Sequence, residues 1–143
     1  MPEALAPGDS PGLLLWRATL SWQRQITAVL KPLHLTHVQF VLLASTWWLT
    51  HIAGETPSQR RIADHANTDP MMTSQVIRAL AARNLITREP DPGDSRAMLI
   101  GVTQEGAALA QQAIVLVEQC DRTFFGAVPD QGALMGTLRA LAR

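Results

Sequence analysis

Residues 58–84 read SQRRIADHANTDPMMTSQVIRALAARN, and this stretch decides the fold. Ser58 can cap a short helix that runs to about Ala66, carrying apolar residues on its inner face. Asp69 is a strong N-cap for a second helix, and Pro70 suits its first position because the missing amide proton costs nothing there. Two short helices joined by a tight turn predict a helix-turn-helix.

The second helix, from Pro70 to about Arg83, has two distinct faces. One stripe at helical spacing is expected to pack: Thr73, Val76, Ile77 and Leu80. The other is expected to be free: Met71, Ser74, Gln75 and Arg78. Gln can pair bidentately with adenine and Arg with guanine, Ser is adaptable, and Met can touch a thymine methyl. An ordinary amphipathic surface helix would show the same pattern, so this helix alone does not establish DNA binding.

A hairpin follows the second helix. Residues 85–88 and 97–102 form short, partly β-branched runs, separated by EPDPGDS, whose prolines, glycine and aspartates predict a turn. Arg96 lies just after the turn, and Asp94 precedes it by two residues. This spacing lets the carboxylate brace the guanidinium while the guanidinium reaches into a narrow minor groove. The hairpin is therefore expected to be a DNA-binding wing.

The helix-turn-helix and hairpin together resemble the multiple antibiotic resistance regulator (MarR) family. The family's wing pattern is matched by Asp94, Arg96, Val102, Thr103 and Gly106. The stretch LTHVQF at 35–40 looks like the start of the family's second helix, and RTFF at 122–125 is similar to its C-terminal end. The resemblance covers about residues 12–142.

The resemblance implies a homodimer that places two recognition helices in successive major grooves of a pseudo-palindromic, double-stranded DNA operator. It also implies individual roles for residues of the second helix and the wing. Ser74, Gln75 and Arg78 would read bases, Met71 and Thr73 would border them, Arg96 would enter the minor groove, and Asp94 would be its brace. The wing EPDPGDSRA has fewer basic residues than is common in the family, which implies weak, salt-sensitive binding.

The whole chain is predicted to be mainly α, with six helices and a small β-hairpin wing. Residues 1–11 should form a mobile arm, and 12–143 a single domain. Helices are expected from about 12 to 32, after the capping box at Thr36 to about 53, at 58–66, 70–83, 104–119 and 130–142. Residues 12–53 and 104–143 would dimerise, and 54–103 would form the DNA-binding lobe.

Dimerisation has independent support in the apolar stripes of the C-terminal helices. A small winged-helix core cannot cover all of them, and exposed patches of this size usually mark an interface. The stripes contain Leu109, Ile114, Val117, Phe124, Phe125, Leu134, Leu138 and Leu141. The alternative is a self-contained helical bundle.

Composition excludes several other classes of protein. The chain has 143 residues, 47% of them hydrophobic, which suits one domain with its own core. The single cysteine, Cys120, cannot form an internal disulfide or a thiolate metal cluster. No phosphate loop, nucleophile elbow or metal-binding helix motif is visible, so we expect neither an enzyme nor a cofactor or metal. With no span-length apolar run and no signal-peptide pattern, we expect a cytoplasmic protein that makes no membrane contact.

The protein is also expected to bind a small-molecule effector. The resembled family often binds aromatic or anionic molecules between its dimerisation helices and its DNA-binding lobe. Trp16, Trp47 and Trp48 are candidate lining residues, although each has a core-filling alternative. The sequence thus predicts a ligand-responsive repressor. Because the formal net charge is zero, a winged-helix module for protein–protein interaction, without specific DNA binding, is the alternative.

Overall fold

The computed structural model describes residues 3–143 and contains six α-helices and one antiparallel hairpin, which confirms the predicted fold class. The elements are α1 (Pro11–Leu30), α2 (His37–Trp47), α3 (Gln59–Ala66), α4 (Pro70–Ala82), β1 (Ile86–Asp91), β2 (Asp94–Val102), α5 (Gln104–Phe125) and α6 (Gln131–Leu141). A π-helical segment, Trp48–Ile52, continues α2.

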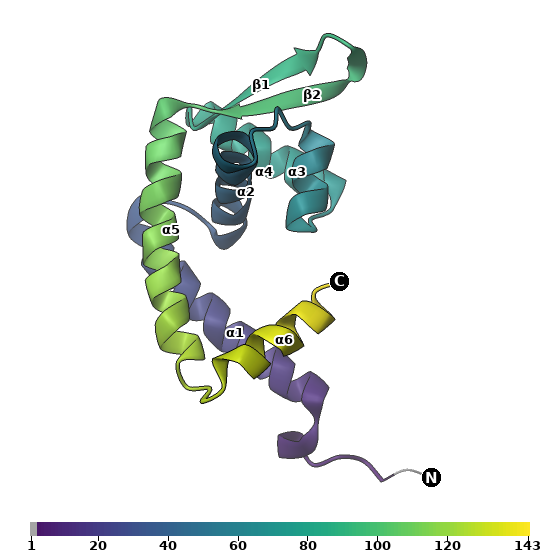
Figure 1. Ribbon diagram of the computed structural model, residues 1–143, viewed down its shortest axis with the longest axis vertical. Helices are drawn as coiled ribbons and strands as arrows, with labels where there is room; N and C mark the ends of the chain where they lie inside the picture. The colour runs from purple at the N-terminus through teal and green to yellow at the C-terminus, as the bar shows by residue number, and fades with distance from the viewer. Residues whose placement is uncertain (1–2) are drawn as a thin grey trace.

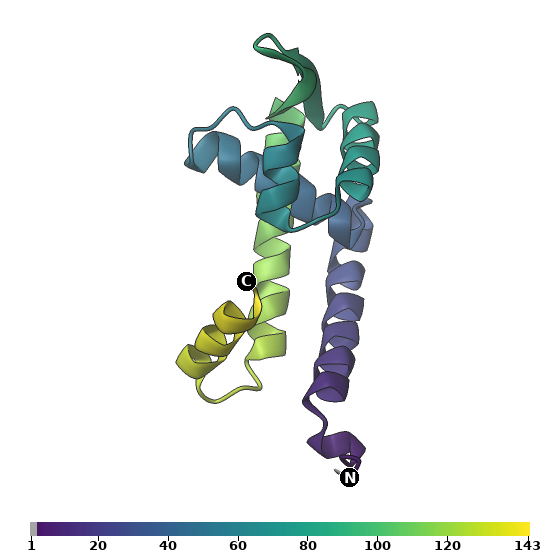
Figure 2. The same ribbon diagram turned by 90° about the vertical axis from the view of Figure 1, so that its right-hand side faces the viewer.

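The helix-turn-helix and the hairpin form a lobe at one end of the molecule (Figure 1). There α2 packs against α3 and α4, and the hairpin β1–β2 projects beyond them. The long helices α1 and α5 pack against each other and extend away from the lobe, and α6 lies near their far ends (Figures 1 and 2). Helix α6 crosses α1 in the view of Figure 1, but the two helices are separated in the view of Figure 2.

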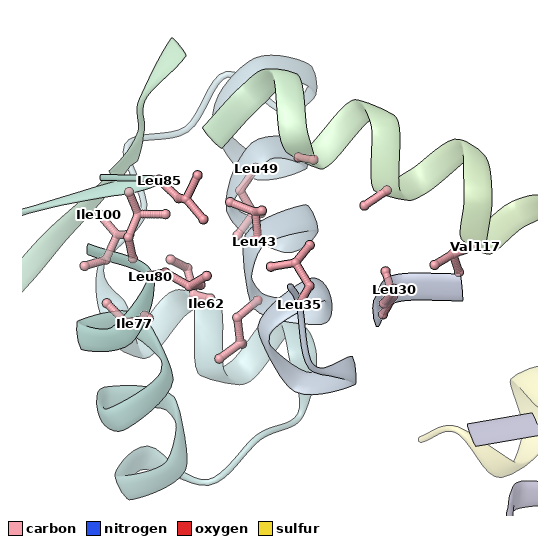
Figure 3. Close-up of a cluster of buried hydrophobic side chains, with 14 of the residues drawn as sticks. Leu30, Leu35, Leu43, Leu49, Ile62, Ile77, Leu80, Leu85, Ile100 and Val117 are labelled. Atoms are coloured by element: carbon pink, nitrogen blue, oxygen red, sulfur yellow. The ribbon is translucent and has the colours of Figure 1, made fainter. Parts of the chain in front are cut away.

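The core of the lobe is built from apolar residues contributed by each of its elements and by α2, which packs against them (Figure 3). Ile62 of α3, Ile77 and Leu80 of α4, and Leu43 of α2 are fully buried, and Ile100 of β2 is 1% exposed. Because these side chains come from separate elements, their common burial fixes the position of α4 relative to the hairpin.

The end of α5, the end of β1 and the start of β2 differ from the prediction. Helix α5 continues past the expected end near Gln119 to Phe125, and the aromatic ring of Phe125 packs near that of Trp22, with centroids 6.5 Å apart. The strands extend through most of EPDPGDS, leaving only Pro92 and Gly93 as the turn. A two-stranded hairpin has two free edges, so a proline in β1 need not cost a ladder hydrogen bond.

The expected mobile arm at 1–11 is described only in part. Met1 and Pro2 lie outside the described residues, while Pro7–Asp9 form a short 3-10 helix. Ser10 then caps α1, accepting a hydrogen bond from the amide of Leu13 at 3.3 Å. The mobility of the arm and the division into dimerisation and DNA-binding parts stay predictions.

The connection from the wing to α5 is made by close backbone packing. Thr103 donates its amide to the carbonyl of Leu85 at 3.1 Å, and its hydroxyl accepts from the amide of Gly106 at 2.9 Å. A Cβ at position 106 would overlap the carbonyl oxygen of Leu85. Glycine is therefore required here by the close approach of two backbone segments.

A hydrogen bond and a ring contact join α1, α2 and α5 beside their apolar core. The indole Nε1 of Trp22 donates to Oδ1 of Asp121 at 2.8 Å, and the Trp22 ring meets the ring of His37 edge-on at 5.0 Å. Burial lowers the pKa of His37 below its ordinary value of 6.5, an effect that the nearby Asp121 carboxylate partly offsets. The junction therefore holds His37 preferentially in its neutral form.

The Gly106→Ala substitution should lower the free energy of unfolding by about 1–3 kcal/mol, because the new methyl group forces the backbone segments apart. The matched control is Gly12→Ala, at a helical position with open space around it. It should leave stability unchanged or raise it by up to about 1 kcal/mol. Urea denaturation at one fixed protein concentration measures both. Equal effects of the two substitutions would contradict the close approach.

Lowering the pH below about 6.5 should destabilise the parent protein through His37. As the pH falls through this value, the unfolded chain binds the proton before the folded chain does, so the free energy of unfolding decreases. His37→Gln should remove this component, which denaturant titrations between pH 7.5 and about pH 5 would detect. His65→Gln, on α3, is the control. If His37→Gln kept the parent's full pH dependence, burial of His37 would not be its source.

Candidate nucleic-acid interface

The turn between α3 and α4 is held by short-range hydrogen bonds. Asn67 has a φ of 55°, the left-handed conformation that ends α3. The carboxylate of Asp69 accepts from the amide of Met72 at 3.0 Å, as its predicted capping role requires. The hydroxyls of Thr68 and Thr73 lie 2.6 Å apart and connect the turn to the first turns of α4. These contacts orient α4 relative to α3.

The two predicted faces of α4 are present in the structure. Ile77 and Leu80 are fully buried, whereas Gln75 and Arg78 are exposed and Met71 is 74% exposed. Because the buried stripe packs on the lobe core, the opposite face is presented to the surroundings. It carries the donors, acceptors and apolar groups suited to reading base edges.

Thr73 is placed under the interface and not on it. Its side chain is fully buried, and its hydroxyl donates to the carbonyl of Asp69 at 2.8 Å. This burial agrees with the expectation that Thr73 belongs to the packing stripe of α4. It argues against the expected place of Thr73 in the DNA-binding surface beside the base readers, because its hydroxyl is used within the turn. Its neighbour Ser74 is half-buried and remains at the edge of the exposed face.

The wing carries Arg96 in an exposed position on β2, beside the two-residue turn. The carboxylate of Asp94 accepts from the backbone amide of Arg96 at 3.0 Å. Over residues 3–143, the one ion pair joins Arg61 and Glu55, with Nε and Oε1 3.0 Å apart. The expected brace between the Asp94 carboxylate and the Arg96 guanidinium is thus replaced by a bond that shapes the backbone, leaving the guanidinium free of an acidic partner.

A groove of about 870 Å³ lies between the wing, α3 and the start of α4. Sequence reasoning missed it because its walls come from three elements. Its charged lining consists of Arg60, Asp64, Asp91, Asp94 and Arg96. The only signal for it in the sequence is the helical spacing of Arg60 and Asp64, which places both on one face of α3.

The three tryptophans named as candidate ligand contacts are dispersed. Trp16 is 63% exposed in the first third of α1, whereas Trp47 and Trp48 lie at the end of α2. The rings of Trp47 and His51 are stacked, with their centroids 6.1 Å apart, and the rings of Trp48 and His65 are stacked with their centroids 5.6 Å apart. No aromatic contact links the three within the described residues. Trp22, which bonds to Asp121, is the tryptophan that connects the helices.

Two helices carry apolar side chains that the single chain leaves uncovered. On α1, Leu15 is 56% and Trp16 63% exposed, and on α6, Leu141 is 67% exposed. Helix α6 contains no buried residue at all. An exposed apolar surface of this extent, formed by both ends of the chain, is typical of a subunit interface.

Residues 3–143 contain neither a single helix long and apolar enough to cross a membrane nor a cluster of metal-binding side chains. No single helix there has both the length and the apolar character needed to cross a membrane; residues 11–33 and 37–52 meet these criteria only when taken together, across a 73° bend. No three His, Cys, Asp or Glu side chains in the same range lie close enough to hold a metal ion.

Comparison with known proteins supports a regulatory role. Residues 35–98 match the MarR family. YdcH, an uncharacterized HTH-type transcriptional regulator of Bacillus subtilis, is 39% identical over 138 residues, which cover 96% of this chain and 92% of YdcH. An HTH-type transcriptional repressor of Mycobacterium tuberculosis is 29% identical over 116 residues, covering 79% of this chain and 78% of the repressor.

A solved structure extends the likeness to the complete fold. BpsR from Bordetella bronchiseptica, whose DNA binding is regulated by 6-hydroxynicotinic acid, is 25% identical and superposes with a TM-score of 0.86. The match covers 98% of both chains. With the exposed face of α4, the adjacent wing and the relative that is 39% identical, these findings show that the chain belongs to the MarR family and is a winged helix-turn-helix transcriptional regulator.

Proposed function

We propose that this regulator is a ligand-responsive repressor that binds a pseudo-palindromic operator as a homodimer. The proposal rests on α4, where Gln75 and Arg78 are exposed on the face opposite the fully buried Ile77 and Leu80. It rests also on Arg96, which is exposed on the neighbouring wing. A helix supported in this way can enter a major groove without disturbing the core.

On α4, Ser74, Gln75 and Arg78 read base edges, and Met71 contacts a thymine methyl. Gln75 and Arg78 are exposed and need no rearrangement to reach the DNA. On the wing, Arg96 enters the flanking minor groove, where a narrow A·T-rich segment concentrates negative potential. Asp94 supports this role by fixing the backbone at Arg96.

Dimerisation uses residues 12–53 and 104–143, and residues 54–103 form the DNA-binding lobe. The exposed apolar faces of α1 and α6 are the surfaces that a second copy covers. Two lobes related by a two-fold axis then meet two half-sites one helical turn apart, which explains why a pseudo-palindrome is the expected operator.

The effector is a small aromatic or anionic molecule that favours a lobe spacing unsuited to adjacent major grooves. Regulation of BpsR by 6-hydroxynicotinic acid, which is both aromatic and acidic, supports this chemical class. Trp47 offers a specific contact because its indole Nε1 is buried without a hydrogen-bond acceptor in the described chain. Trp16 and Trp48 remain candidate lining residues. The protein acts in the cytoplasm and, like the other regulators of its family, performs no catalysis.

Arg78→Ala should weaken binding to the operator by about 1–3 kcal/mol and relax the preference at one base position. Binding of the purified protein to its own upstream intergenic DNA, and to fragments with each base pair substituted, measures both effects. Arg122→Ala on α5 removes the same charge away from the lobe and should retain the parent's sequence preference. An unchanged base preference for Arg78→Ala would contradict its role as a reader.

Arg96→Ala should weaken binding most strongly on operators with A·T-rich flanks, since the guanidinium reads the narrow minor groove there. Two fragments with identical half-sites but A·T-rich or G·C-rich flanks, titrated at one salt concentration, provide the comparison. Ser95→Ala changes the neighbouring exposed wing position and serves as the control. If the parent bound none of these fragments in preference to scrambled DNA at any salt concentration, the protein-interaction hypothesis would replace the DNA-binding one.

A further inference from the structure

The groove between α3 and the wing separates the two elements proposed to enter the DNA. Pro70 at the start of α4 contributes to one side, and Arg96 and Met98 of β2 contribute to the other. Residues of α3 complete the lining, and the groove has a volume of about 870 Å³. The groove therefore lies between α4, which is proposed to enter the major groove, and the wing, which is proposed to enter the minor groove.

Duplex geometry determines what must cross this groove. Adjacent major and minor grooves of B-DNA are separated by one sugar-phosphate strand. If α4 occupies the major groove and the wing the next minor groove, that strand passes between them. This step rests on the proposed function, because it requires both elements to contact the same duplex.

We propose that the groove is the binding site for this sugar-phosphate strand and that Arg60 contacts its phosphate. Arg60 is exposed, lines the groove, and is the lining cation that does not belong to the wing. Its neighbour Arg61 lies outside the lining and is engaged by Glu55, with donor–acceptor distances of 3.0 and 3.2 Å. Of the two adjacent arginines, Arg60 is thus the one free to meet a phosphate.

The same groove is also lined by carboxylates, whose negative charge repels a phosphate. Asp91 and Asp94 each accept a backbone amide at the wing turn, from Gly93 at 2.9 Å and from Arg96 at 3.0 Å. Asp64 lies one helical turn after Arg60 on the same face of α3 and also lines the groove. The carboxylate of Asp64 repels the incoming strand, so this residue reduces affinity for DNA of any sequence.

The first test is the salt dependence of binding for the full-length protein on its upstream fragment. Arg60→Ala should lower the slope of log affinity against log salt by about 0.9, the value expected when one phosphate is no longer neutralised. Between 50 and 200 mM salt the affinity of the parent should therefore fall by a factor about 3.5 times larger than that of the variant. Arg61→Ala, a matched charge removal on the same helix, should keep the parent's slope, and Arg60→Lys should retain it as well.

A second test locates the phosphate directly. Single neutral methylphosphonates are placed along the strand between the half-site and its flank. One position should weaken binding by the parent about as much as Arg60→Ala does, and should have no added effect on that variant. If every methylphosphonate weakened both proteins equally, Arg60 would not contact this strand, although the proposed regulator function would stand. Absence of selective binding by the parent would overturn both.

The opposing carboxylate predicts a gain of affinity. Asp64→Asn should strengthen binding about two- to fivefold, similarly on operator and scrambled DNA, because it removes a repulsive charge near the backbone. Glu118→Gln, on α5, makes the same charge change away from the groove and should have a smaller effect. Equal gains in the two variants, or no gain in Asp64→Asn, would show that Asp64 does not face the strand.

Discussion

The burial of one stripe of α4 in the core of the lobe is the constraint on which the interface depends. Ile77 and Leu80 are fully buried against residues of α2, α3 and β2, so α4 has a single rotational setting. That setting presents Gln75 and Arg78 outward. Truncation of a buried residue would therefore affect both stability and the orientation of the reading face.

Charge is distributed in a way that the zero net charge conceals. Within the lobe, Arg61 forms an ion pair with Glu55, whereas Arg78 and Arg96 are exposed on α4 and on the wing, the two elements proposed to contact DNA. Aspartates nevertheless line the groove between these elements. We therefore expect phosphate neutralisation to contribute only modest affinity, and sequence-specific contacts to carry a larger share of the binding than in a strongly basic regulator.

The proposed regulation requires a firm connection between the lobe and the long helices. The Trp22–Asp121 hydrogen bond and the neighbouring His37 tie α1, α2 and α5 together beside the lobe. At the other end of the lobe, Gly106 allows α5 to begin directly against the backbone of Leu85. A change in the relative setting of α1 and α5 would be transmitted to the wing through these contacts, which is the physical requirement for an effector-responsive lobe spacing.

Sequence alone determined the helices, their caps and the two faces of α4, because each depends on residues within a few positions of one another. The caps at Asp69 and Thr103 are examples, as are the exposed Gln75 and Arg78. Only the tertiary structure decided that the three candidate tryptophans are dispersed and that Arg60 lines a groove, because these depend on packing between distant segments. The wing shows both cases: its turn was visible in composition, but hydrogen-bond geometry decided that Asp94 holds the backbone amide of Arg96.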